Sequence, residues 1–160
     1  MATTKDVHIV RTLDAPRERV WEAWTNPDDI KKWWGPEGFS APSVQQDLRT
    51  GGKFVYAMQG PPGSEWDKVT YSGGEYVEVV PMEKIVATDY FCDENGNWID
   101  PSTIGMPGEW PEKMKVTITF EDAGEGKTKL TVHHEGHSVE MAENAEAGWS
   151  SSLDKFAKIL

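Results

Sequence analysis

The stretch that decides the fold is the C-terminal one, VEMAENAEAGWSSSLDKFAKIL, which runs from Val139 to Leu160. Its apolar residues recur at steps of three and four, so they lie on one side of a helix. These residues are Met141, Ala145, Trp149, Leu153, Phe156 and Leu160. A helix of about 20 residues spans roughly 30 Å. Its apolar side must be buried against another element.

The preceding residues predict that element. From Ala41 to Glu135 the apolar residues alternate with polar ones, which is typical of antiparallel strands with one buried face. The clearest examples are Phe54, Tyr56 and Met58; Val116, Ile118 and Phe120; and Leu130 and Val132. Gly51-Gly52 predicts a hairpin turn, and Gly73-Gly74 predicts a bulge or sharp bend within a strand. We therefore expect a curved sheet around the C-terminal helix.

A first strand is predicted at Val7 to Leu13, and two short helices follow it. Pro16 suits the first turn of one helix, and Asn26 is a candidate N-cap for the next. Gly35-Pro36 ends the second helix. The predicted order is one strand, two helices, six strands and one long helix, which is an α+β arrangement.

The segment from Asp93 to Glu112 fits no strand. It is too long for a hairpin turn and carries Trp98, Ile99, Ile104, Met106 and Trp110. Long loops in compact domains are usually functional or disordered. We interpret this one as a folded flap, with Trp98 and Trp110 as candidate lid residues.

Composition limits the classes of function. The chain of 160 residues is expected to form a single domain over 1–160. Its net charge of −11 argues against nucleic acid and anionic membrane as partners. No apolar run approaches the roughly 20 residues of a membrane span, so we expect a cytoplasmic protein. Its single cysteine, Cys92, excludes an internal disulfide. Monomer and homodimer both remain open.

Four motifs carry a resemblance to a known family. They are the run from Arg11 to Trp24, Trp33-Trp34-Gly35-Pro36, the run from Asp47 to Phe54, and Gly148-Trp149 with Leu153. In these motifs the chain resembles the activator-of-Hsp90-ATPase-homologue-like group of the SRPBCC, or START-like, superfamily. The resemblance implies a helix-grip fold, in which a curved antiparallel sheet of six or seven strands holds the C-terminal helix. It also implies a deep cavity between helix and sheet. The chain departs from the family mainly in its long, tryptophan-bearing segment from Asp93 to Glu112.

An aromatic interior is the main candidate binding site. Large apolar side chains with a few hydroxyls and one imidazole suit a small-molecule pocket, although they also suit an ordinary core. The candidate ligand-binding residues are Trp33, Trp34, Phe54, Tyr56, Met58, Tyr76, Met114, His134 and Trp149. The expected ligand is a small apolar or aromatic molecule, and no cofactor is expected.

His134 and Asp89 are the candidates for acid–base chemistry. His134 continues the alternation of Leu130 and Val132, so it should face the interior. Alternation does not decide whether Asp89 faces inward. His133, Glu135 and His137 share a parity, but Gly136 bends the chain between them, and no metal site is expected. The sequence contains no motif for a catalytic nucleophile.

Three functions follow from these features. The favoured one is a small hydrophobic ligand-binding protein that performs no chemistry. The first alternative is a cavity enzyme of the cyclase or hydrolase type that uses acid–base catalysis. The second is a regulator of a chaperone ATPase or a stress-response interaction module. Whether the protein is an enzyme is left open, with the binding role preferred.

Overall fold

The computed structural model describes residues 4–106, 110, 112–139 and 141–160. Within these residues, seven strands form one antiparallel sheet in the order β1-β7-β6-β5-β4-β3-β2. The strands are β1 Thr4–Leu13, β2 Val44–Gln46, β3 Lys53–Gln59, β4 Val69–Val80, β5 Lys84–Cys92, β6 Met114–Gly124 and β7 Lys127–Ser138. The first strand of the chain thus pairs with the last, while β2 forms the other edge.

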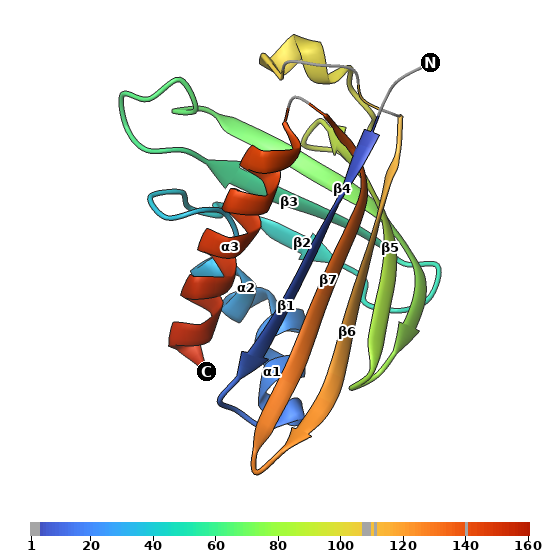
Figure 1. The fold of residues 1–160 in the computed structure, drawn as a ribbon. Helices are drawn as coiled ribbons and strands as arrows, with labels where there is room; N and C mark the ends of the chain where they lie inside the picture. The colour runs from blue at the N-terminus through green and yellow to red at the C-terminus, as the bar shows by residue number, and fades with distance from the viewer. Residues whose placement is uncertain (1–3, 107–109, 111, 140) are drawn as a thin grey trace.

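Four helical segments in the described part of the chain complete the fold. They are α1 Arg17–Thr25, α2 Pro27–Trp33, the short 3-10 helix η1 Pro101–Ile104 and α3 Ala142–Ile159. Figure 1 shows α3 lying across the concave face of the sheet, with α1 and α2 near its C-terminal end and η1 at the opposite end. This arrangement confirms the predicted α+β helix-grip fold and the predicted order of elements. No helix in the described parts of the chain is both long and apolar enough to span a membrane.

The apolar side of α3 holds the helix on the sheet. Leu153 and Phe156 are completely buried, and Trp24 and Trp33 pack their rings on Phe156 at centroid distances of 5.3 and 5.0 Å. The Nζ of Lys155 donates hydrogen bonds to backbone carbonyls in the loop after α2, the nearest being Gly35 O at 3.0 Å. The two short helices are thereby joined to α3 and to the core. The predicted start at Val139 was too early, because α3 begins at Ala142.

The backbone at two glycine pairs, Gly51-Gly52 and Gly73-Gly74, differs from the sequence-based prediction. β2 ends at Gln46, so residues 47–52 form a longer connection than a two-glycine hairpin. Gly73 pairs with Val55 and Tyr90, Gly74 pairs with Phe54, and the register shift in β4 comes between Tyr76 and Glu78. Gly74 is required for a different reason, since a Cβ there would lie 1.9 Å from the carbonyl oxygen of Thr88. Close approach of β5, rather than a bulge, accounts for this glycine.

Candidate functional site

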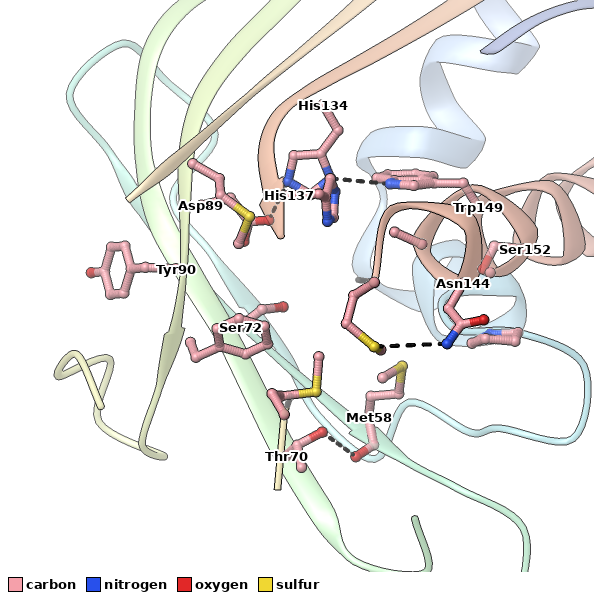
Figure 2. A pocket seen from close by; sticks show the side chains of 18 of the residues that line it. Met58, Thr70, Ser72, Asp89, Tyr90, His134, His137, Asn144, Trp149 and Ser152 are labelled. Atoms are coloured by element: carbon pink, nitrogen blue, oxygen red, sulfur yellow. Dashed lines mark hydrogen bonds and ion pairs between the residues drawn. The ribbon is translucent and has the colours of Figure 1, made fainter. Parts of the chain in front are cut away.

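A cavity of about 280 Å³ lies between α3 and the sheet. Its walls come from the loop after α2, from β3, β4, β5, β6 and β7, from the segment after β5, and from α3. The side chains that matter below are those of Trp34, Met58, Asp89, Phe91, Met106, Trp110, Met114, His134, His137, Met141, Ala145 and Trp149. Aromatic rings and four methionines form most of this wall, so the cavity is mainly apolar. Figure 2 shows Asp89, His134 and His137 grouped at one end, whereas Thr70, Asn144 and Ser152 lie on other parts of the wall.

The structure brings together part of the predicted binding set. Five of its nine members line the cavity, namely Trp34, Met58, Met114, His134 and Trp149. Trp33 does not, because it is 1% exposed in the core and its Nε1–H donates to the Ala23 carbonyl at 2.9 Å. The contribution of Trp33 is therefore packing between the short helices and α3.

The other three predicted residues, Phe54, Tyr56 and Tyr76, line a smaller adjoining pocket of about 50 Å³. The two tyrosine hydroxyls both donate to Oε1 of Gln46, at 2.8 and 3.0 Å. Burial raises the pKa of Tyr76 to about 12 and raises that of Tyr56 well above its usual value of 10. Both hydroxyls therefore stay protonated and act as donors near neutral pH. The rings of Phe54, Tyr56 and Tyr76 thus fill much of the space around this smaller pocket. The larger cavity beside it remains open.

The two candidate lid residues are placed differently. Trp110 lines the cavity and packs edge-on against Phe91 and His137, at centroid distances of 5.2 and 5.7 Å. Trp98 is 45% exposed and borders a separate surface hollow, so it does not reach the cavity. The predicted flap also includes residues 107–109 and 111, which lie outside the described residues. Its described part contains η1 and a bridge between Trp98 and Cys92.

Asp89 and His134 face each other across the cavity wall. Ile85 and Ala87 of β5 are buried, and Asp89 continues their alternation, which resolves its orientation as inward. Oδ2 of Asp89 lies 2.7 Å from Nε2 of His134, at ion-pair distance but without hydrogen-bond geometry. His134 is 5% exposed, as its place in the alternation of β7 predicts.

His137 joins this group, although its sequence parity is opposite to that of His134. Gly136 has a φ of +98°, and β1 shifts register opposite it, between Lys5 and Val7. The extra residue is a β-bulge, which returns His137 to the inner face. Nε2 of His137 then lies 2.9 Å from Nδ1 of His134. The glycine was the visible signal in the sequence, but alternation alone placed His137 outside.

Trp149 of α3 fixes the protonation pattern of the two imidazoles. Its Nε1–H donates to Nδ1 of His134 at 3.1 Å, and an indole nitrogen can only donate. Nδ1 of His134 is therefore the acceptor, and the proton of the neutral ring is on Nε2, facing Asp89. Figure 2 shows Asp89, His134, His137 and Trp149 converging from β5, β7 and α3.

Burial controls the charge of His137. It lowers the pKa of His137 from 6.5 to about 4, with a smaller contribution from neighbouring His134 in the same direction. Asp89 and Asp6 oppose this effect without cancelling it. His137 is consequently neutral at physiological pH, and the cavity contains an uncharged imidazole rather than a cation.

The outer face of the same strands gathers a different set of residues. His133 and Glu135 project away from the cavity, and Asp6 of β1 joins them so that one ligand atom of each lies within 4.8 Å of the others. Nε2 of His133 is 3.1 Å from Oδ2 of Asp6, and Glu135 is 4.0 Å from Lys115. Sequence reasoning missed Asp6 because it comes from the opposite end of the chain. His137 does not belong to this group, since the bulge turns it inward.

Cys92 is 1% exposed, and burial raises the pKa of its thiol to about 12. A protonated, enclosed thiol is a poor nucleophile. Cys92 is therefore a small residue of the core.

The fold and cavity define an α+β helix-grip protein with an aromatic, methionine-rich pocket. Residues 14–160 match the family described as Activator of Hsp90 ATPase homolog 1-like protein, and the chain belongs to that family.

Solved structures agree with this assignment. Protein CV1439 from Chromobacterium violaceum is 32% identical, with a TM-score of 0.77 over 96% of this chain and 95% of that one. Protein Ms6760 from Mycobacterium smegmatis is 25% identical, with a TM-score of 0.76 over 99% of this chain and 95% of that one. The AHSA1 protein SPO3351 from Silicibacter pomeroyi shares the fold, with 24% identity and a TM-score of 0.73. This match covers 96% of each of the two chains. Among curated proteins, none matches this sequence.

Proposed function

We propose that this protein binds a small, mainly apolar aromatic molecule in the cavity between α3 and the sheet. The observation that carries the proposal is the cavity of about 280 Å³ with aromatic and methionine walls. An apolar cavity of about 150 Å³ is large enough to bind benzene, so this one has room for a guest of about twice that size. A fused two-ring molecule such as naphthalene meets that requirement.

The chemistry of the wall also favours such a guest. Trp34 and Trp149 offer ring faces and edges, and Met58 and Met114 offer polarizable sulfur, which contacts aromatic rings favourably. Asp89 adds a carboxylate at the polar end, and the protein's net charge is −11. Both features disfavour an anionic guest, so a neutral molecule is the better fit.

Thermal unfolding with 2-methoxynaphthalene tests this function. A ligand at about 100 times its Kd adds about 2.7 kcal/mol, which raises Tm by about 5–10 °C for a protein of this size. The variant Ala145→Phe places a ring in the cavity and should reduce the shift severalfold. Ala147→Phe makes the same substitution at an exposed position of α3 and should leave the shift intact. Absence of a Tm shift in wild-type protein for this probe and for 2-naphthol would overturn the proposal.

A second candidate function rests on the pair formed by Asp89 and His134. A carboxylate 2.7 Å from an imidazole nitrogen in an apolar cavity is a pairing that general acid–base catalysts use. A cavity enzyme would bind its substrate in the same place, so ligand binding comes first in either case. Asp89→Asn should abolish turnover of any substrate found while leaving its binding within a few fold.

A chaperone-directed role is supported only by the description of the family, which refers to an activator of the Hsp90 ATPase. An ATPase assay with an Hsp90-type chaperone tests it directly. Unchanged turnover in the presence of this protein would remove that role without affecting the ligand-binding proposal.

A further inference from the structure

Two buried ring nitrogens at the polar end of the cavity make no hydrogen bond within the described part of the chain, and only one of them, Nε2 of His134, has a charged partner, Asp89. His137 is 6% exposed and lines the cavity, and among the described residues no protein group bonds to its Nδ1. Buried polar atoms in proteins are paired in the great majority of cases, because an unpaired one loses its bonds to water without replacement. An unpaired ring nitrogen on a residue that lines the cavity therefore indicates a contact that the protein does not supply.

The neighbouring residues determine what kind of contact is missing. Nδ1 of His134 accepts from the indole N–H of Trp149, so it has no proton to give to His137. The 2.9 Å contact between the two histidines must then be a donation from Nε2–H of His137 to Nδ1 of His134. A neutral imidazole carries one N–H. Nδ1 of His137 is consequently a bare lone pair, and the missing partner is a hydrogen-bond donor.

The charged groups around His137 narrow the class of donor. Asp89 on β5 and Asp6 on β1 are the acidic groups that act on its ring, while Trp110 covers it from the segment after β5. A carboxylate guest could not donate to Nδ1 and would be repelled by Asp89. A neutral hydroxyl donates one hydrogen bond and brings no charge into an apolar wall.

We propose that the guest of this cavity is a neutral aromatic alcohol whose hydroxyl donates to Nδ1 of His137, while its rings occupy the space between Trp34, Trp149 and the methionines. This inference rests on the proposed function, since it specifies the ligand of the same cavity. His137 is then the specificity-determining residue. Trp149, His134 and His137 form a hydrogen-bonded series that positions the acceptor, Nδ1 of His137. Each ring in the series determines which nitrogen of the next ring is protonated.

A matched pair of probes tests the inference in the unmodified protein. The compounds 2-naphthol and 2-methoxynaphthalene share the same rings and the same oxygen, but only 2-naphthol can donate. Isothermal titration should show 2-naphthol binding about 10-fold more tightly, the preference expected where a buried acceptor would otherwise stay unpaired. Equal affinities of the two probes for wild-type protein would overturn this inference and leave the proposed function standing. Failure of both probes to bind would overturn the two together.

Variants on one strand identify the acceptor. His137→Phe keeps a ring in the wall and removes Nδ1, so the two probes should bind with equal affinity. His133→Phe changes a histidine on the outer face of the same strand and should retain the preference of about 10-fold. A preference that persists in His137→Phe would overturn the assignment to His137. The wild-type comparison is decisive even if that variant fails to fold.

Discussion

Burial of a neutral His137 makes the stability of this protein sensitive to mild acid. The pKa of His137 is about 4 in the folded protein against 6.5 in the unfolded chain. The unfolded chain therefore binds more protons between these two values, and protonation favours unfolding. The contribution of His137 to stability is complete above pH 6.5 and is lost progressively as the pH falls toward 4. Between pH 7 and pH 4.5 the loss is about 2 kcal/mol.

Urea unfolding of wild-type protein and His137→Phe at pH 7.0, 5.5 and 4.5 measures this loss. With an m-value of about 2 kcal/mol/M, the wild-type midpoint should fall by about 1 M more than that of the variant over this range. The comparison removes the effect of acidic groups common to both proteins. His8→Phe is the control, because His8 is exposed on the outer face and should keep the wild-type pH dependence. Parallel pH profiles for wild type and His137→Phe would refute the reasoning.

Three further substitutions test how the fold supports the cavity. Leu153→Ala removes a completely buried side chain of α3 and should cost about 3 kcal/mol of unfolding free energy, whereas Lys158→Ala, at an exposed position, should stay within about 0.5 kcal/mol. Gly148→Ala should stabilise the protein by about 0.5–1 kcal/mol and raise Tm, because its Cβ would lie at an ordinary 3.6 Å from Pro36 within a helix; a lower Tm would contradict this. Gly136→Ala should cost about 1–3 kcal/mol in chemical denaturation, since its φ of +98° disfavours any side chain, and an unchanged midpoint would count against the bulge.

Periodicity predicted the layers of the fold because burial follows regular spacing along regular elements. The three- and four-residue steps through Leu153 and Phe156 predicted the buried side of α3, and alternation through Leu130 and Val132 predicted the inner face of β7. The same alternation predicted that His134 faces inward. Such patterns indicate which side of an element is covered. They contain no information about what covers it.

The arrangement of Asp89, His134 and His137 at the polar end of the cavity could not be predicted from periodicity, for two physical reasons. A single β-bulge at Gly136 reverses the parity of the residues that follow it, so His137 came inward against its spacing. The contact between Asp89 and His134 is made between β5 and β7, and its 2.7 Å distance depends on strand register. Trp33 was predicted to line the pocket, but it is buried in the core instead. Aromatic character alone does not distinguish these two positions.

The central claim is that the cavity beside α3 holds an aromatic guest, and the indole N–H signals of the protein's eight tryptophans report on it directly. A titration with 2-methoxynaphthalene, followed by nitrogen-15-resolved NMR, should shift the signals of Trp34 and Trp149, which line the cavity. Trp98 borders a separate surface hollow, and its signal should stay in place. Movement of the Trp98 signal while Trp34 and Trp149 remain fixed, or no movement at all at saturating probe, would contradict the account.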